Sequence, residues 1–396
     1  MGNLPRREFL VTAAMAAAAP ALAQNAEIAG FEQQAVDPDA APAWEPYADR
    51  KLRVGLVGNG LCKFASAFFF QDHPLVEVVA VSDLLPDRCA ELAQTTRCAT
   101  TYPSLEEMLD KEQRLEAVFL ATDAPRHARQ AIHVLERGLH VASAVPACFG
   151  SLEDAEALYD AVRRAPGKYM VFETSTFHEP VHAARTMAAA GVLGDPVYVE
   201  GEYYHYMTTP LPSYEDWRVG LPPQFYPTHS NAYYVSVAGG HFTEVSCYGR
   251  PSILEHLTPA GNRYGNPFGT EIALFRTDNG GAARMAVSWD TPGHEGEMGR
   301  IRTTRGTYAG NWNGAELPEG FDLRRPGLPP GVDGGGHGGS HGYLCDEFVR
   351  ACLTNSEPRV NNIAWALNMT VAGIVAHESA LKDGETMKIP TYRWPV

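Results

Sequence analysis

A glycine-rich stretch near the end of the chain carries the side chains best suited to moving protons. His337 lies within the run Gly334 to Gly339, and His341 follows four residues after it. An imidazole changes charge near neutral pH, which suits it to general acid or base catalysis. Glycine lets the backbone approach a ligand closely, and we expect no apolar neighbour to bury the His337 ring. The stretch is either a functional loop or a flexible surface loop, and we expect the first.

Other polar aromatic groups could complete such a site. Tyr226 and His229 stand in the segment Tyr-Pro-Thr-His, and Tyr204 lies in a cluster of three tyrosines and one histidine at 203–206. That cluster could form a wall for a sugar ring or could simply pack as a strand. The residue types alone favour a structural role for His229. The two histidines of the glycine-rich stretch have a spacing that suits a metal ion on a helix, but the glycines argue against a helix there. We therefore expect no metal site.

A strand, a glycine turn and a second strand form the element that would hold a cofactor. Apolar residues 52–57 run into Gly58-Asn59-Gly60, a helix is expected at 63–71, and a second strand at 76–82 stops at Asp83. In such a unit the glycines let the backbone approach a pyrophosphate at the helix N-terminus, and the acid accepts hydrogen bonds from the ribose. An acid at this point favours NAD over NADP. Lys63 replaces the third glycine of the usual motif, so the prediction depends on the strand-turn-helix-strand context.

The rest of the chain indicates two kinds of sheet. Helices and strands alternate to about residue 175, which predicts an α/β domain with a doubly wound parallel sheet of the Rossmann type. After residue 180 strand-like segments dominate, and Asp278-Asn279-Gly280 is a hairpin signal between two of them. We expect these strands to form an open antiparallel sheet in a C-terminal α+β domain. The predicted divisions are a signal peptide at 1–23, an extended arm at 24–50, an NAD-binding Rossmann domain at 51–175, and a substrate and oligomerisation domain at 176–396.

The N-terminus and the overall charge bear on where the protein works and what it binds. Arg6-Arg7 precedes an alanine-rich stretch and the small-residue cleavage pattern Ala21-Leu22-Ala23, which predicts export by the twin-arginine route, for example to the periplasm. The formal net charge is −15, and no Lys/Arg cluster follows the first ten residues. Nucleic acids and anionic membranes attract basic patches, so neither is an expected partner.

Taken together, the motifs resemble the Gfo/Idh/MocA oxidoreductase family, which joins a Rossmann domain to an open antiparallel sheet. The resemblance lies in VGLVGNG at 54–60, VSD at 81–83, FLATDAPRH at 119–127, ERGLHVASAVP at 136–146 and GVLGDPVYVEGEY at 191–203. In the dehydrogenases of the family, a Glu-Lys-Pro segment supplies a lysine to the nicotinamide ribose and the substrate hydroxyl. This chain has Ala144-Val145-Pro146 at those positions.

A narrower resemblance is to glycoside hydrolase family 109, through HVASAVPA at 140–147, YPTH at 226–229 and GGHGG at 335–339. It implies NAD as a cofactor and glycoside cleavage by transient oxidation at C3, elimination, water addition and re-reduction. It also implies catalytic roles for His229, His337 and Tyr226. We expect a carbohydrate substrate in contact with His341 and Tyr204, and a homo-oligomer. The residues assigned to the cofactor are Gly58, Asn59, Gly60, Leu61, Asp83, Thr122, His127 and Pro146.

Two other functions remain open from the sequence. One is a periplasmic NAD-dependent sugar or polyol dehydrogenase. The other is a nucleotide-binding, sugar-sensing protein that has lost catalysis, which Ala144 and Val145 suggest because they replace two polar residues of the dehydrogenases.

Overall fold

The computed structural model describes residues 43–293 and 296–394. The expected signal peptide at 1–23 and most of the expected arm at 24–50 lie outside these residues. In the described part, no helix combines the length and the apolar character needed to cross a bilayer.

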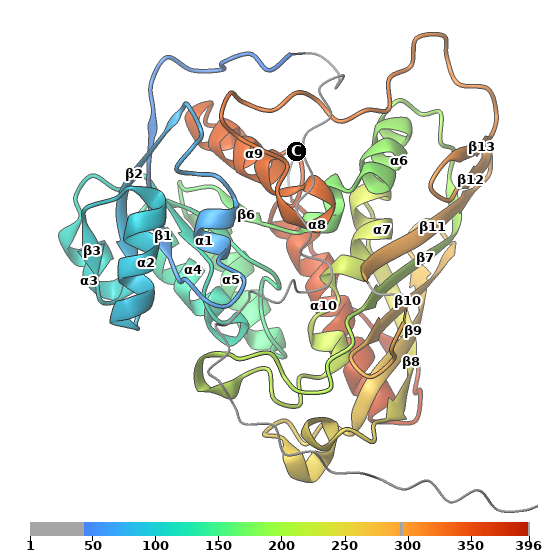
Figure 1. The fold of residues 1–396 in the computed structure, drawn as a ribbon. Helices are drawn as coiled ribbons and strands as arrows, with labels where there is room; N and C mark the ends of the chain where they lie inside the picture. Colours follow the sequence, from blue (N-terminus) through green and yellow to red (C-terminus); the bar gives the residue numbers. More distant parts are fainter. Residues whose placement is uncertain (1–42, 294–295, 395–396) are drawn as a thin grey trace, which may run out of the picture.

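Six strands form one parallel sheet at the left of Figure 1. They are β1 (Leu52–Val57), β2 (Val76–Ser82), β3 (Thr101–Tyr102), β4 (Ala117–Leu120), β5 (His140–Ser143) and β6 (Tyr169–Val171). Their spatial order, β3-β2-β1-β4-β5-β6, is that of a doubly wound dinucleotide-binding fold. The central strand β4 is apolar and buried along its whole length, as expected for a strand with helices on both faces. The predicted Rossmann sheet is confirmed, whereas a domain boundary at 175 stays a prediction.

The helices of this half follow the sequence expectation with one exception. They are α1 (Phe64–Ala67), α2 (Pro86–Thr96), α3 (Leu105–Lys111), α4 (His127–Glu136) and α5 (Leu152–Arg164). Ser104 caps α3, because its Oγ accepts a hydrogen bond from the backbone N–H of Glu107 at 3.2 Å. The exception is α1, predicted at 63–71. It is a single turn, and shortly after it Phe69 takes a left-handed backbone conformation (φ 63°) that a helix cannot contain.

Eight strands form the second sheet, at the right of Figure 1. They are β7 (Pro196–Tyr204), β8 (Phe242–Pro251), β9 (Phe268–Thr277), β10 (Ala282–Ser288), β11 (Gly296–Thr303), β12 (Gly306–Tyr308), β13 (Trp312–Gly314) and β14 (Met387–Lys388). The order is β13-β12-β11-β7-β10-β9-β8-β14. All pairs are antiparallel except β7 with β10, so the sheet is mixed rather than purely antiparallel. Asp278-Asn279-Gly280 forms the expected turn between β9 and β10.

The α-helices of this half, within the described residues, are α6 (Glu179–Ala189), α7 (Thr228–Ala238), α8 (Gly336–Gly339), α9 (His341–Leu353) and α10 (Ile363–Ala380). Helices α7 and α10 lie between the two sheets (Figure 1) and contact strands of the second. Helix α7 was not predicted from the sequence. Its residues 228–237 are all buried, so the helix has no polar face and lacks the amphipathic period that identifies a surface helix.

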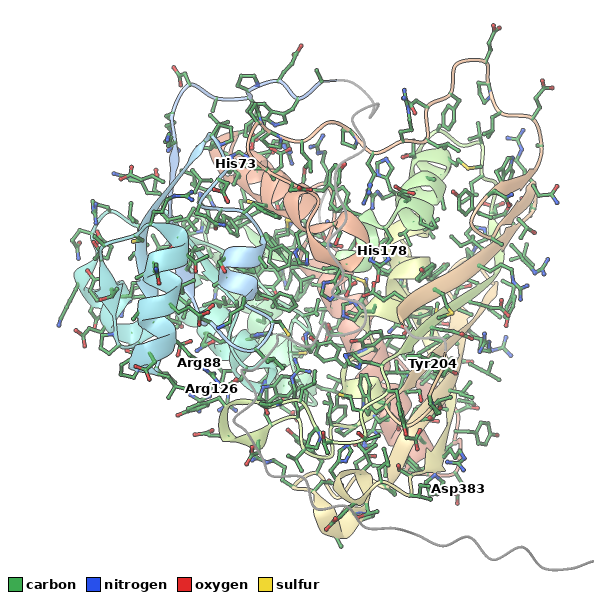
Figure 2. The ribbon with its side chains drawn as sticks, viewed as in Figure 1. His73, Arg88, Arg126, His178, Tyr204 and Asp383 are labelled. Carbon is green, nitrogen blue, oxygen red and sulfur yellow. The ribbon has the colours of Figure 1, made fainter. Side chains whose placement is uncertain are left out.

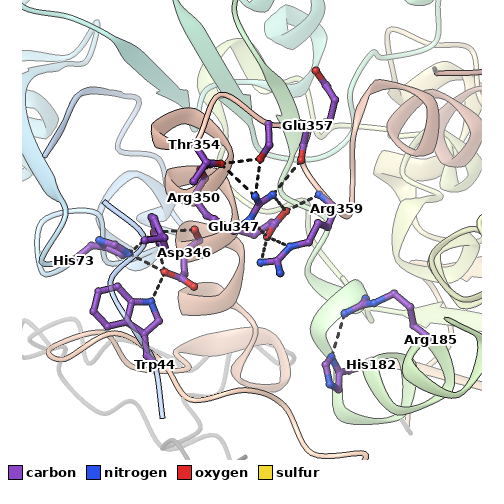
Figure 3. Close-up of polar contacts among 12 residues, drawn as sticks. Trp44, His73, His182, Arg185, Asp346, Glu347, Arg350, Thr354, Glu357 and Arg359 are labelled. Atoms are coloured by element: carbon purple, nitrogen blue, oxygen red, sulfur yellow. Dashed lines mark hydrogen bonds and ion pairs between the residues drawn. The ribbon is translucent and has the colours of Figure 1, made fainter. Parts of the chain in front are cut away.

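Helix α9 is fixed to its surroundings by polar contacts on two sides (Figure 3). Asp346 accepts a hydrogen bond from the indole of Trp44 at 2.9 Å and lies 3.1 Å from Nε2 of His73. Glu347 is paired with Arg350 at 2.8 Å and with Arg359 at 2.7 Å. The start of this helix, where the glycine-rich stretch ends, is therefore held in a defined place.

Candidate functional site

A cleft of about 1080 Å³ lies at the carboxyl ends of β1, β2 and β4, where nucleotides bind in doubly wound folds. Six of the residues assigned to the cofactor line it: Gly58, Gly60, Leu61, Asp83, Thr122 and His127. Tyr214, Trp217 and Arg218 line it from the C-terminal half of the chain. The cofactor cleft is therefore built by both halves.

The glycine turn is shaped by close contacts that only glycine permits. Gly58 has φ 94°, and a Cβ there would lie 2.5 Å from the carbonyl oxygen of Ala121. Asp83 orders the same turn, because its carboxylate accepts hydrogen bonds from the backbone N–H groups of Asn59 at 2.6 Å and Leu85 at 2.8 Å. The acid that we expect to select NAD is thus held at the cleft edge by the backbone itself.

Lys63, at the position of the missing third glycine, lies on the cleft wall in a left-handed conformation (φ 52°). Its ammonium group forms an ion pair with Glu91. The Asn59 side chain donates to the same carboxylate at 3.1 Å. These contacts tie the turn to α2.

Two of the cofactor assignments, His127 and Pro146, behave differently from the glycine turn. The buried ring of His127 lies 2.9 Å from the carbonyl oxygen of Pro146 through Nδ1 and 3.1 Å from that of Thr122 through Nε2. Burial lowers the pKa of His127, although the two carbonyl groups oppose the shift. His127 thus joins the loops after β4 and β5. Pro146, whose peptide bond with Val145 is cis, lies behind the lining of the cleft.

A second, inner pocket of about 520 Å³ adjoins the cofactor cleft. The two share Phe64, Ala144, Val145, Arg218 and Tyr226 as walls. The structure brings the three predicted catalytic residues, Tyr226, His229 and His337, together in the inner pocket. Aromatic rings of Tyr203 and Trp289 complete its floor.

His229 is held as a cation by two buried carboxylates. Its Nδ1 lies 2.8 Å from Glu173 and 3.5 Å from Glu297. Burial disfavours the charged imidazole, but the two carboxylates outweigh it and raise the pKa of His229 to about 9. Because Nδ1 is occupied, the opposite nitrogen, Nε2, is the atom available to a ligand.

The second carboxylate contacts more than one group. Glu297 accepts a hydrogen bond from the hydroxyl of Ser175 and lies 3.2 Å from Nε2 of His178, which Figure 2 labels between the two halves of the molecule.

The pKa of His337 is shifted in the opposite direction from that of His229. Only 5% of its surface is exposed, and its ring lies 5.6 Å from that of Phe64, so the expectation that no apolar neighbour would bury it is wrong. Burial and the neighbouring histidines, chiefly His341 and His229, hold the pKa of His337 well below 6.5. A neutral and a charged imidazole therefore stack 6.1 Å apart in one pocket.

The glycines of the GGHGG segment are explained by this arrangement. His337 itself has a left-handed backbone (φ 50°), and so do Gly335, Gly338 and Gly339. A Cβ on Gly338 would lie 2.8 Å from the ring of His178. The segment is a tight turn with little side-chain bulk. Residues far from it in the sequence can therefore approach closely and bury the His337 ring.

The two predicted substrate contacts lie outside the inner pocket. His341 stands behind His337, with Nε2 3.0 Å from Nδ1 of His337. Tyr204 (Figure 2) is half-buried and lines neither pocket, because successive residues of a strand face opposite sides of a sheet. Its neighbour Tyr203 lines the pocket instead.

Sequence reasoning missed Arg218, Glu173 and Glu297. Arg218 lines both cavities and has its guanidinium 4.2 Å from the ring centre of Trp217. A guanidinium at this junction could bind a phosphate of a dinucleotide. Glu173 follows the end of β6, where parallel-sheet sites gather, and that position was a usable signal. No local pattern marks Glu297.

Glu173, His229 and Glu297 together have the composition of a metal site. Ligand atoms of Glu173, His229 and Glu297 lie within 4.8 Å of one another. The 2.8 Å contact between Nδ1 of His229 and Glu173 has the length of a charge-assisted hydrogen bond, which places a proton between the two atoms. We therefore interpret the cluster as an ion-paired group.

The half of the chain that contains the parallel sheet matches a known protein family. Residues 52–173 match the model of the oxidoreductase family with an NAD-binding Rossmann fold, Gfo/Idh/MocA. This part of the chain is therefore similar to the NAD-binding Rossmann domain of that family, whose cofactor is NAD.

Two similar proteins carry the description glycosyl hydrolase family 109. The chain is similar to glycosyl hydrolase family 109 protein 1 of Bacteroides fragilis, with 29% identity over 177 residues, which is 42% of this chain and 38% of that protein. It is 24% identical over 325 residues to a family 109 protein of Streptomyces niveus, covering 74% and 66% of the two chains. The matched region thus spans only about two fifths of the first relative's length.

Solved structures agree in fold over a larger share of the chain. A levoglucosan dehydrogenase in complex with NADH and levoglucosan has a TM-score of 0.70 at 18% identity, covering 86% of this chain and all of that one. The WlbA dehydrogenase from Bordetella pertussis, in complex with NADH and UDP-GlcNAcA, has a TM-score of 0.69 at 21% identity and covers 88% of this chain and all of that one.

Proposed function

We propose that the protein is an NAD-dependent, carbohydrate-active enzyme that cleaves glycosides by transient oxidation of the sugar. The observation that carries the proposal is the pair of imidazoles, one neutral and one charged, in a pocket that shares its walls with the cofactor cleft. Groups whose environments push their pKa values apart are suited to separate base and acid roles.

The cofactor site fits NAD by the geometry of its own residues. At Gly60 an added Cβ would meet no protein atom within 4 Å, so the turn is open to the cleft where a pyrophosphate would lie, and Asp83 presents a carboxylate at the cleft edge. Bound NAD supplies a hydride acceptor that can return the hydride at the end of the reaction.

In the proposed reaction His337 takes the proton of the sugar C3 hydroxyl on Nε2 as the C3 hydride leaves, and C3 becomes a carbonyl carbon. The carbonyl acidifies the proton on C2. The C2 proton passes to solvent water, and the bond from C1 to the leaving oxygen breaks with its electron pair going to that oxygen, which takes up a proton; the sugar becomes an enone. The His229 cation stabilises the negative charge that develops on the C3 oxygen in this step. Water then adds across the double bond, and the hydride returns to C3.

Tyr226 supplies a neutral hydrogen-bond donor beside this pair. Burial raises the pKa of its phenol to about 12, against the opposing charge of Arg218, so the hydroxyl keeps its proton at neutral pH. The absence of a lysine at Val145 fits a pathway in which the histidines carry the protons.

A panel of chromogenic glycosides tests the proposal on the purified full chain. We expect release of the aglycone with no net NADH, because the hydride returns to the sugar. Stoichiometric NADH from free sugars or polyols would identify a dehydrogenase instead. No turnover of either class, with NAD bound, would identify a protein that has lost catalysis.

Export by the twin-arginine route is part of the proposal and depends on residues outside the described part of the chain. Replacing Arg6 and Arg7 together by lysine should leave the precursor in the cytoplasm. Assembly into a homo-oligomer stays a prediction.

A further inference from the structure

A chain of two hydrogen bonds runs from the main chain to the catalytic pocket. Nδ1 of His341 lies 3.1 Å from the carbonyl oxygen of Ala67, and Nε2 of His341 lies 3.0 Å from Nδ1 of His337. A carbonyl oxygen only accepts hydrogen bonds, so Nδ1 of His341 carries the hydrogen. In a neutral imidazole the other nitrogen, Nε2, is then an acceptor, and Nδ1 of His337 must donate to it.

This order of donors and acceptors determines which nitrogen of the neutral His337 ring carries the hydrogen. When Nδ1 of His337 carries the hydrogen, Nε2 keeps its lone pair. We infer that His341 is a positioning residue, which holds His337 in the tautomer whose Nε2 can accept a proton from the substrate. The base role of Nε2 rests on the proposed function, whereas the tautomer follows from the two contacts and the neutrality of His341.

Three separate segments of the chain are needed for the relay. Ala67 ends the single turn α1, His337 lies in the glycine-rich turn, and His341 begins α9. The ring of His341 packs 4.3 Å from that of Phe68. Gly335 is required for this approach, because a Cβ there would lie 3.0 Å from the Cβ and Nδ1 of His341. The fold therefore positions a ring that does not itself line the pocket.

Burial and the surrounding histidines keep the rings of His337 and His341 neutral. The titratable groups that act on His337 are His341 from α9, His229 from α7, and His178 and His205 from the segments beside the pocket. His229, which the pocket holds as a cation, would repel a proton on His337. Burial lowers the pKa of His341 to about 4, which keeps it neutral at physiological pH.

Two substitutions separate hydrogen bonding from packing. His341→Phe keeps a flat ring against Phe68 but removes the acceptor, whereas His341→Gln keeps an acceptor near the position of Nε2. We expect His341→Phe to lower kcat by about 100-fold with little change in KM, since general base catalysis contributes on this scale. His341→Gln should recover at least about tenfold of that loss. Equal losses in the two variants at equal melting temperature would overturn the inference.

Nitrogen-15 NMR of histidine-labelled full chain gives a readout that does not depend on turnover. We expect the His337 ring of the wild type to be neutral with its hydrogen on Nδ1, and His341→Phe to populate the other tautomer. A wild-type ring with its hydrogen on Nε2 would overturn the inference whatever the activity. The expected tautomer without any glycoside cleavage would contradict the proposed function and leave the positioning by His341 intact.

Discussion

At the scale of single residues, the site is defined by the contrast between His229 and His337. Its glycine neighbours drew attention to His337 in the sequence, whereas the resemblance to glycoside hydrolase family 109 drew attention to His229. Their charges could not be predicted, because the groups that set them come from far along the chain: Glu173 after β6 and Glu297 on β11. Burial of His337 was missed for the same reason, since Phe64 supplies the apolar contact from another part of the chain.

The carboxylate of Glu173 should set the alkaline limit of activity. Its charge raises the pKa of His229, while the imidazolium lowers the pKa of Glu173 against the effect of burial. With the wild type we expect kcat/KM to fall as pH rises through about 9, where His229 loses its proton. Glu173→Gln should move this fall to lower pH, because burial of His229 is then less opposed. The pH dependence of kcat/KM for both proteins measures the shift.

A matched control exists elsewhere in the chain. Glu271 is also fully buried and lies 2.7 Å from Nδ1 of His377, outside both pockets. Glu271→Gln makes the same chemical change in a similar environment and should leave the alkaline limit near pH 9. If both variants shift the limit equally, or neither does, Glu173 does not act through His229.

At the scale of secondary structure, the strands and the glycine turn of the cofactor cleft followed from local pattern. Helix α7, which carries His229, did not, because a helix buried on all sides has no amphipathic period. The segment from Pro212 to Arg218 was also missed as part of the cofactor cleft. Loops that cross from one half of a molecule to the other leave no periodic signal.

An ion pair links that segment to the Rossmann half. Arg126, labelled in Figure 2, forms an ion pair with Glu215 at 2.9 Å and lies 5.1 Å from the ring centre of Tyr214. Both charged groups are largely exposed, so the pair contributes at most about 1 kcal/mol. We expect Arg126→Ala to speed NADH release by up to about fivefold, measured by stopped-flow fluorescence. Glu215→Gln should give an effect of the same size, and unchanged release in both variants would show that the contact does not retain the cofactor.

At the scale of the whole molecule, the sequence predicted the two kinds of sheet and their order along the chain. It did not predict the parallel pairing of β7 with β10, because pairing direction depends on contacts between strands about 80 residues apart. The inner pocket lies between the two halves because α7, which carries His229, and α10 pack between the two sheets.

Neutral histidines, buried at His341 and half-buried at His182, should make the fold sensitive to mild acid. The pKa values of His182 and His341 are lowered from 6.5 to about 4, mainly by burial. Between pH 6.5 and 4 the unfolded chain therefore binds more protons than the native state, and stability must fall as the pH falls. Urea denaturation between pH 7 and 5 should show a decreasing free energy of unfolding. His341→Gln should make that decrease shallower, and an identical slope in wild type and variant would contradict the assignment of a neutral, buried His341.

The central claim is that the sugar is oxidised, loses its C2 proton and is reduced again within one turnover. Cleavage of a glycoside in D2O tests it most directly. We predict that the released sugar carries deuterium from solvent at C2 and the original hydrogen at C3, with no net NADH formed. A released sugar with no deuterium at C2 would contradict the claim, because direct hydrolysis leaves that carbon untouched.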